Sequence, residues 1–209
     1  MTNQEEYLAF FRDKAERAAY ELIPGQGVVM ISAPHSVEQT RNGNLKFGEY
    51  ETGVLAKLLH DDLGCPVIYK TCNLGDDANY DEVCAYKSAL KQYVDEEYID
   101  YVIDLHELHP GRENNFDLGT GNGDNIAADP VILDIVRSEL LERDFDKVVV
   151  DDIFNARYPY TVSSYIAREC QISCLQVEIN SKLLCSGFEE YRFDDVYAAL
   201  RGAVLRLNA

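Results

Sequence analysis

Apolar residues follow two alternating patterns along the chain: short continuous runs, and longer segments in which apolar positions recur every three or four residues. The short runs are rich in β-branched residues and are bounded by glycine, proline or polar turns, which is typical of strands buried in a sheet. They predict strands at 27–33, 66–71, 101–106, 115–121, 147–151 and 174–179. The helical spacing predicts a first helix that ends near Pro24 and Gly25, and further helices at 49–62, 81–94, 130–140, 161–167 and 194–207.

Strands and helices alternate regularly, and no internal repeat or linker divides the chain. This order is typical of proteins in which helices cover both faces of a sheet. We therefore expect one α/β domain over residues 1–209, folded as a three-layer α/β/α sandwich with a largely parallel or mixed central sheet. Ligands of such sheets bind beyond the carboxyl ends of the strands. The first candidates for a ligand site are therefore His35, His106 and the polar turn 73–79, which follow predicted strands.

The charge balance restricts the partners of the protein. The chain has 37 acidic and 19 basic residues and a formal net charge of −18, with no local basic patch. Phosphate backbones and anionic lipid surfaces would be repelled by such a chain. We expect neither nucleic acid nor membrane as a partner. The 46% of hydrophobic residues are enough for an ordinary globular core, which excludes a disordered or fibrous chain.

The N-terminal segment and the cysteines indicate a cytoplasmic protein. Residues 1–22 carry many charges, and no apolar stretch approaches the length of a signal or membrane-spanning segment. The cysteines form no C-x-x-C pair and are too sparse for a disulfide framework, so we interpret them as free thiols. They are Cys65, Cys72, Cys84, Cys170, Cys174 and Cys185.

Two histidines and a glutamate have the spacing of a metal site. Glu38 follows His35 by three residues in one loop, and His106 ends a neighbouring predicted strand. Two histidines and one carboxylate with an open position are the ligands of hydrolytic zinc sites. The H-x-x-E spacing also arises by chance, and the alternative interpretation of His35 is a loop histidine bonded to the backbone.

His106 has additional support from Asp104. The two residues lie on one face of the predicted strand, where the carboxylate could hold the second ring nitrogen of the imidazole. The segment from His106 to His109 differs from the metalloprotease motif H-E-x-x-H, because its histidines are three residues apart and are followed by Pro110. His109 is a reserve ligand, and His60 is interpreted as a surface histidine.

The last predicted strand has one polar face, formed by Gln176, Glu178 and Asn180. An edge strand half exposed to solvent would show this alternation. A general base at the carboxyl end of a strand would show it as well, with Glu178 as the proton-accepting carboxylate. The spacing alone leaves both interpretations open.

Five segments, in this order, resemble the N-formylglutamate amidohydrolase family, which is related to the zinc carboxypeptidases and to aspartoacylase. The segments are 33–38, 77–81, 103–106, 116–120 and 175–180, within a similarity that spans about residues 28–183. The resemblance implies that Zn²⁺ is bound by His35, Glu38 and His106, and that Glu178 is the catalytic carboxylate. It also implies that Asn79 and Arg112 hold a carboxylate of the substrate.

The sequence differs from the family pattern in the segment that binds the substrate. The family pattern Asp-Leu-Asn-Arg is replaced by Asp-Ala-Asn-Tyr at 77–80, so an arginine is missing. Lys70 or Arg112 could supply the lost positive charge, and Arg41 and Arg157 are further loop candidates. Taken one at a time, each arginine is better explained as an ordinary surface residue.

Together these observations predict a zinc-dependent hydrolase that cleaves an amide bond in a small N-acyl, N-formyl-like amino acid or a peptide-like substrate. The alternative is a catalytically silent metal-binding or ligand-binding protein that retains the hydrolase fold. The sequence contains no G-x-S-x-G motif for a serine nucleophile. The acyl group and the oligomeric state are left open.

Overall fold

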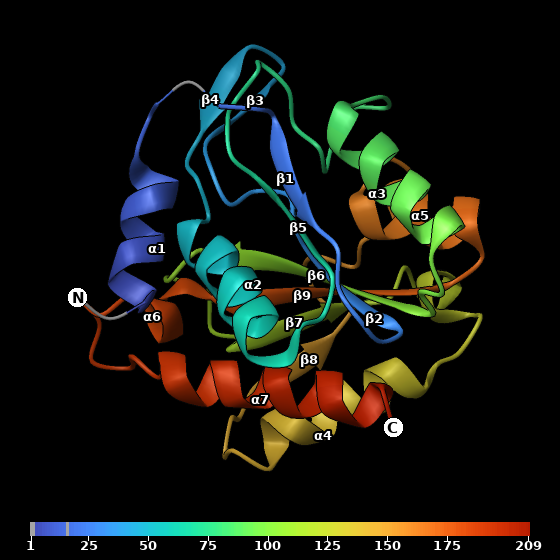
Figure 1. Cartoon of the computed structure of the whole chain (residues 1–209). Coiled ribbons are helices and arrows are strands. Elements are labelled where there is room, and N and C mark those ends of the chain that lie inside the picture. The colour runs from blue at the N-terminus through green and yellow to red at the C-terminus, as the bar shows by residue number, and fades with distance from the viewer. Residues whose placement is uncertain (1–2, 16) are drawn as a thin grey trace.

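The computed structural model describes residues 3–15 and 17–209, and a seven-stranded sheet forms its centre (Figure 1). The strand order is β1-β5-β2-β6-β9-β7-β8. The bounds are β1 Tyr20–Ile23, β2 Val29–Ala33, β5 Val67–Lys70, β6 Tyr101–Leu108, β7 Phe116–Gly119, β8 Val148–Val150 and β9 Ser173–Asn180. The central strands β5, β2, β6 and β9 are parallel, whereas β1 at one edge and the β7–β8 pair at the other run in the opposite direction.

Helices cover both faces of this sheet, so the predicted three-layer sandwich is confirmed (Figure 1). Helices α2, α4 and α7 pack on one face, with α1 against α2, and helices α3 and α5 pack on the other. The central strands serve both layers, because Ile31 of β2 joins one hydrophobic cluster and Met30 the other. The helices are α1 Asn3–Arg12, α2 Tyr50–Leu63, α3 Ala85–Glu96, α4 Val131–Leu141, α5 Val162–Cys170, α6 Ser181–Leu184 and α7 Phe193–Leu207, with a 3₁₀ turn at Asp124–Ile126.

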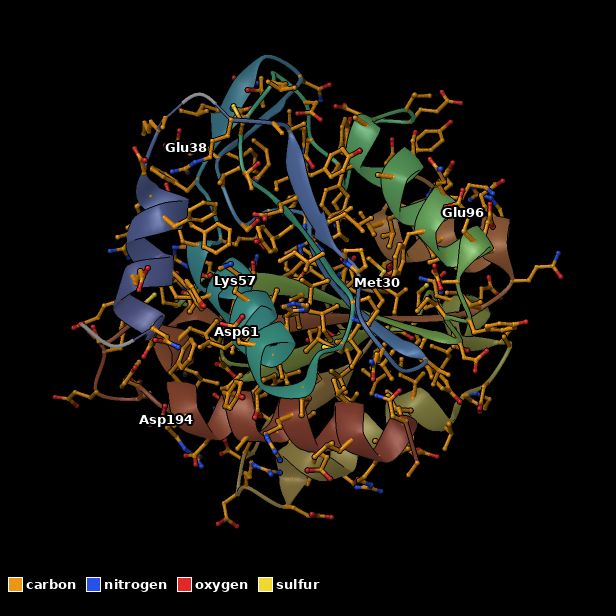
Figure 2. The ribbon with its side chains drawn as sticks, in the orientation of Figure 1. Met30, Glu38, Lys57, Asp61, Glu96 and Asp194 are labelled. Carbon is orange, nitrogen blue, oxygen red and sulfur yellow. The ribbon has the colours of Figure 1, made fainter. Side chains whose placement is uncertain are left out.

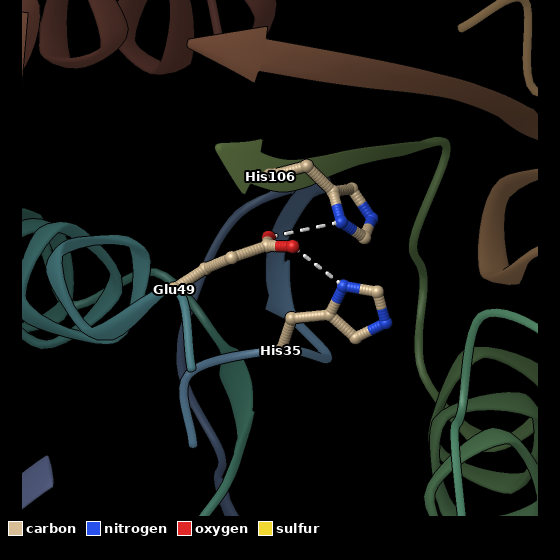
Figure 3. Close-up of side chains that lie close together, drawn as sticks. All are labelled: His35, Glu49 and His106. Carbon is tan, nitrogen blue, oxygen red and sulfur yellow. Dashed lines mark hydrogen bonds and ion pairs between the residues drawn. The ribbon is translucent and has the colours of Figure 1, made fainter. Parts of the chain in front are cut away.

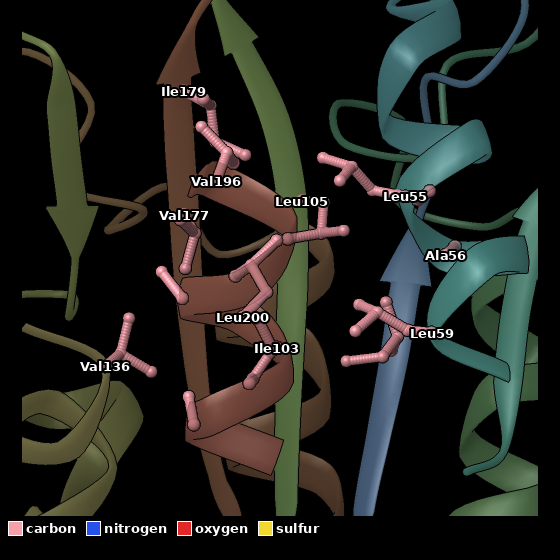
Figure 4. Close-up of a cluster of buried hydrophobic side chains, with 14 of the residues drawn as sticks. Leu55, Ala56, Leu59, Ile103, Leu105, Val136, Val177, Ile179, Val196 and Leu200 are labelled. Carbon is pink, nitrogen blue, oxygen red and sulfur yellow. The ribbon is translucent and has the colours of Figure 1, made fainter. Parts of the chain in front are cut away.

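Strands β6 and β9 pair side by side, and the larger hydrophobic cluster packs on one face of this pair (Figure 4). Ile103 and Leu105 of β6, and Val177 of β9, lie with apolar residues of α2 and α7 in this cluster. Successive side chains of a strand point to opposite faces. The polar residues between them, His106 and Glu178 included, therefore lie on the other side of the sheet.

The first predicted helix is too long. Helix α1 ends at Arg12, and Tyr20–Ile23 forms the edge strand β1. Residues 20–23 pair antiparallel with residues 67–70 of β5, so the ladder hydrogen bonds of the sheet replace those of a helix. Among the described residues no helix is long and apolar enough to cross a bilayer.

Two predicted helix starts have different outcomes. The helix predicted at 161–167 begins as its range indicates: the Thr161 side chain caps α5 by accepting a hydrogen bond from the Ser164 N–H. The helix predicted from residue 81 begins instead at Ala85, so Asp81 does not cap α3. The Asp81 carboxylate instead accepts a hydrogen bond from the Asp77 N–H and closes the turn before the helix.

A two-stranded hairpin absent from the sequence prediction follows β2. Its strands are β3 Gln39–Arg41 and β4 Asn44–Lys46, and they lie at the top of Figure 1. The turn residues Asn42 and Gly43 have φ values of 52° and 75°. Two positive φ values define the type I′ turn, for which Asn-Gly is the favoured pair.

Candidate active site

Three side chains from distant parts of the chain meet at the carboxyl ends of β2 and β6 (Figure 3). His35 follows β2, His106 lies in β6, and Glu49 immediately precedes α2. The two oxygens of Glu49 face one histidine each, at 2.8 Å from His35 Nδ1 and 3.2 Å from His106 Nδ1. The imidazole rings are 4.8 Å apart, so all three side chains can reach one ion.

Each histidine is oriented by a buried aspartate on its other ring nitrogen. Asp77 lies 3.0 Å from His35 Nε2, and Asp104 lies 3.3 Å from His106 Nε2. Both aspartates are fully buried. The predicted support of His106 by Asp104 is therefore confirmed, and His35 has an equivalent partner that the sequence analysis did not identify. Metal-binding histidines typically have such carboxylate partners, which fix the tautomer and the ring orientation.

The charges of this cluster stabilise one another. Burial disfavours the charged imidazole of His35, but the carboxylates of Glu49 and Asp77 outweigh this effect and raise its pKa. Burial also opposes the charge of His106, whose pKa is nevertheless raised well above its usual value by Asp104 and Glu49. Despite its own burial, Glu49 has a lowered pKa because both histidines face it. The carboxylate is thus ionised and available as a ligand.

Glu38, predicted as the third ligand, lies elsewhere. Its carboxylate is 3.0 Å from Lys14 Nζ, near the connection between α1 and β1 (Figure 2). The chain enters β3 directly after this residue, and the side chain that points inward is that of Gln39, which donates a hydrogen bond to the His35 carbonyl oxygen at 2.9 Å. The position expected for Glu38 is taken by Glu49, whose N–H donates to the same carbonyl oxygen.

Glu178 lies beside this cluster on the neighbouring strand. It is the register partner of His106 in the β6–β9 ladder and is 6% exposed. Gln176 Nε2 donates a hydrogen bond to Glu178 Oε1 at 3.1 Å. Burial raises the pKa of the Glu178 carboxyl to about 8, although His106 acts in the opposite direction. The strand is buried along its whole length, so the half-exposed edge interpretation is wrong.

These residues line a cavity of about 660 Å³. The hairpin β3–β4 forms one wall, and the loop 153–158 forms another. The loop is held by Asp117, a fully buried residue of β7 whose carboxylate accepts the N–H groups of Ile153 and Phe154 at 2.7 and 2.9 Å. Asp117 is a structural residue of the site; the sequence analysis included it in segment 116–120 but gave it no role of its own.

The predicted substrate-binding residues have different environments. Asn79 lines the cavity, but its Oδ1 accepts a hydrogen bond from the Val162 N–H at 2.7 Å. Lys70 is fully buried, its ammonium group is paired with Asp76, and it does not line the cavity. Arg112 is also absent from the cavity wall. Neither residue belongs to the cavity lining, so substrate binding by Lys70 and Arg112 stays a prediction from the sequence.

Comparison with solved structures identifies the fold. No family model matches the sequence, and no curated protein sequence is similar to it. A bacteriophage poly-gamma-glutamate hydrolase superposes with a TM-score of 0.60 at 14% identity, covering 92% of this chain and 91% of that one. N-formylglutamate amidohydrolase from Ralstonia eutropha gives 0.58 at 13% identity, with 92% and 98% covered. A metallo-carboxypeptidase from Burkholderia cenocepacia gives 0.52 at 14% identity, with 97% and 67% covered. The resemblance to amidohydrolases and zinc carboxypeptidases is confirmed at the level of the fold.

Proposed function

We propose that the protein is a zinc-dependent hydrolase of an amide bond in a small N-acyl amino acid or a peptide-like substrate. The observation that carries this proposal is the convergence of His35, Glu49 and His106 in a cavity that also holds the carboxyl group of Glu178. The names of the structural neighbours, which include an amidohydrolase, a metallo-carboxypeptidase and a polyglutamate hydrolase, support the same reaction class.

The donor set fits a catalytic metal. Two imidazole nitrogens and one carboxylate, each on a different segment of the chain, leave room for a further ligand from the cavity side. Asp77 and Asp104 hold the imidazoles so that both Nδ1 atoms face Glu49. When bound, a divalent ion at this position polarises the substrate carbonyl and acidifies a water molecule.

Glu178 is the proton carrier in this proposal. Hydrolysis adds the hydroxide of one water to the acyl carbon, breaks the carbon–nitrogen bond and places the proton on the leaving amine. Gln176 donates a hydrogen bond to Oε1 of Glu178. Within the described part of the chain, no hydrogen bond is made by Oε2. Oε2 is then the atom that accepts the proton of the water and passes it to the nitrogen.

The test combines metal analysis with turnover. Purified protein should contain about one zinc per chain and should hydrolyse at least one member of a panel of N-formyl, N-acetyl and N-succinyl amino acids and short peptides. Glu178→Gln should keep its metal and fold but lower kcat by about 10²- to 10⁴-fold, the usual contribution of a general base. Zinc binding without any turnover would support the silent binding protein instead.

Replacing a ligand should have a different effect from replacing the base. His106→Ala removes one of the three side chains around the ion, so metal content and activity should fall together. Near-full activity of Glu178→Gln would exclude Glu178 as the general base. Glu107 would then be the next carboxylate to test in that role. The cytoplasmic location and the single-domain organisation stay predictions from the sequence.

A further inference from the structure

Three polar side chains on the cavity wall form a chain of hydrogen bonds that ends at the carboxylate of Glu178. Asn79 Nδ2 lies 3.5 Å from Gln176 Oε1, and Gln176 Nε2 donates to Glu178 Oε1 at 3.1 Å. All three residues line the cavity, and Gln176 is only 2% exposed. We propose that Asn79 and Gln176 are positioning residues, which orient Glu178 for proton transfer. This inference rests on the proposed amide-hydrolase function and names two residues that act through its general base.

The direction of this chain is set by a backbone group that can only donate. The Val162 N–H is one of the first N–H groups of α5, which have no partner within the helix, and it donates to Asn79 Oδ1 at 2.7 Å. The Asn79 amide therefore presents its donor, Nδ2, toward Gln176. An amide nitrogen donates and does not accept, so Gln176 receives it through Oε1. The other end of the Gln176 amide, Nε2, then faces Glu178.

Two acceptors hold the Gln176 amide in this orientation. Its Nε2 lies 3.3 Å from the carbonyl oxygen of Phe154 and 3.1 Å from Glu178 Oε1. A flipped amide would place Oε1 against both of these oxygens and Nε2 against the Asn79 donor, so all three contacts would be lost. Oε1 of Glu178 is therefore fixed, which leaves Oε2 as the oxygen that takes up the proton.

The turn that contains Asn79 also positions a proposed metal ligand. The Asn79 N–H donates to Asp77 Oδ1 at 3.0 Å, and the same oxygen lies 3.0 Å from His35 Nε2. Asn79 thus contacts the partner of His35 through its backbone and the partner of Glu178 through its side chain. The relative position of the metal ligand and the general base is set before a substrate enters, which reduces the reorganisation that the reaction needs.

Kinetics distinguish positioning from the substrate binding that the sequence predicted for Asn79. Gln176→Met keeps the length of the side chain and removes its donors, whereas Asn79→Asp keeps the acceptor for Val162 and removes the donor to Gln176. The substrate is the member of the N-acyl amino acid panel that the wild-type protein hydrolyses fastest. Each variant should lower kcat about 10- to 100-fold, the effect of a misplaced reacting group, and should change KM by less than about twofold. A raised KM with an unchanged kcat would overturn the inference.

Gln92→Met is the matched control for the substitution at Gln176. Gln92 is exposed on α3 and also donates to a glutamate, with its Nε2 at 2.9 Å from Glu96 Oε1, but neither residue lines the cavity. The control removes a glutamine–glutamate hydrogen bond outside the site, so kcat and KM should both stay unchanged.

A double-mutant cycle tests the chain of hydrogen bonds without turnover. Melting temperatures are compared for Asn79→Asp, Glu178→Gln and the double variant, at a pH above about 8, where Glu178 is ionised. With Asn79→Asp alone, the Gln176 amide has a carboxylate at each end and can donate to only one of them. In the double variant the amide can flip, because the amide introduced at position 178 donates to its Oε1. Asn79→Asp should therefore lower the melting temperature less in the Glu178→Gln background.

The same cycle in the Gln176→Met background retains the repulsion between the two carboxylates but lacks the amide between them. The difference measured with Gln176 present should exceed this reference by about 2–4 °C, the shift that one hydrogen bond produces in a chain of this length.

The outcomes separate this inference from the proposed function. Absence of this excess, or a wild-type kcat in both Gln176→Met and Asn79→Asp, overturns the positioning inference, while zinc content and turnover by the wild-type protein still support the hydrolase. The excess in a metal-loaded protein that hydrolyses no amide would overturn the proposed function and would still support the orientation of Glu178 by Asn79 and Gln176.

Discussion

Exchanging one carboxylate for an amide at Glu49 and, separately, at Glu38 tests which glutamate belongs to the metal site. Glu49→Gln keeps the size of the side chain but removes the charge that faces His35 and His106 at 2.8 and 3.2 Å. Glu38→Gln removes only the ion pair with Lys14, outside the cavity. The two substitutions are chemically identical, so a difference in metal affinity reports the position alone.

The size of the effect follows from the number of ligands. Structural zinc sites with four protein ligands bind with apparent free energies of about 10–16 kcal/mol, or about 2.5–4 kcal/mol for each ligand. Loss of the charged ligand should therefore weaken zinc binding by about 10²- to 10³-fold. Glu38→Gln should change the zinc affinity by less than about twofold, because a surface ion pair contributes little and touches no ligand.

Competition with a chromophoric chelator at fixed pH measures both affinities on the same scale. Circular dichroism and melting curves of the metal-free proteins should show that both variants are folded. A large loss of affinity in Glu38→Gln together with wild-type affinity in Glu49→Gln would refute the ligand set derived from the structure.

Three further predictions concern the residues around the ligands. Asp77→Asn and Asp104→Asn should each lower zinc affinity about 10- to 100-fold by chelator competition, since each removes the partner of a histidine. Asp117→Ala should lower the free energy of unfolding by about 2–4 kcal/mol in urea titrations, because the N–H groups of Ile153 and Phe154 lose their acceptor. In the metal-free protein, the pKa of Glu178 of about 8 against an ordinary 4.5 means that the folded state retains a proton that the unfolded chain releases. Stability should then fall as the pH rises from about 4.5 to 8, by at most about 1.4 kcal/mol per pH unit, and Glu178→Gln should remove this contribution.

The layers of the fold could be predicted from the sequence because buried strands and amphipathic helices have distinct periods. The run at 101–106 and the helical spacing at 49–62 correspond to β6 and α2 within two residues at each end. The segment at 20–23 was assigned to a helix because its apolar residues continue the spacing of α1. Its actual conformation depends on pairing with β5, about 50 residues later, which a local pattern does not contain.

The hairpin has a local signal in the sequence. Asn42-Gly43 is the preferred type I′ turn pair, and both residues have positive φ. Recognising that turn would have separated Glu38 from Glu49 by a two-stranded excursion. The chain would then be seen to return to the site at Gly48, immediately before α2.

The candidate metal ligands also differ in how far the sequence indicates them. His35 and His106 were identified because each follows or ends a buried strand, and neighbouring parallel strands bring their carboxyl ends together. Glu49 lies at the start of a helix and reaches the site only through packing of α2 on the sheet, so its role required the tertiary structure. Spacing alone favoured Glu38, which is nearer in sequence but faces Lys14.

Asp77 connects His35 at the candidate metal site to Arg41 of the β3–β4 hairpin. One oxygen of its carboxylate lies 3.0 Å from His35 Nε2, and the other accepts the Nε–H of Arg41 at 2.8 Å. Removing Arg41 would leave the whole negative charge of this buried group to His35, which strengthens the imidazole as a base and as a ligand. The hairpin residue Arg41 and the candidate metal ligand His35 are therefore coupled through a single aspartate.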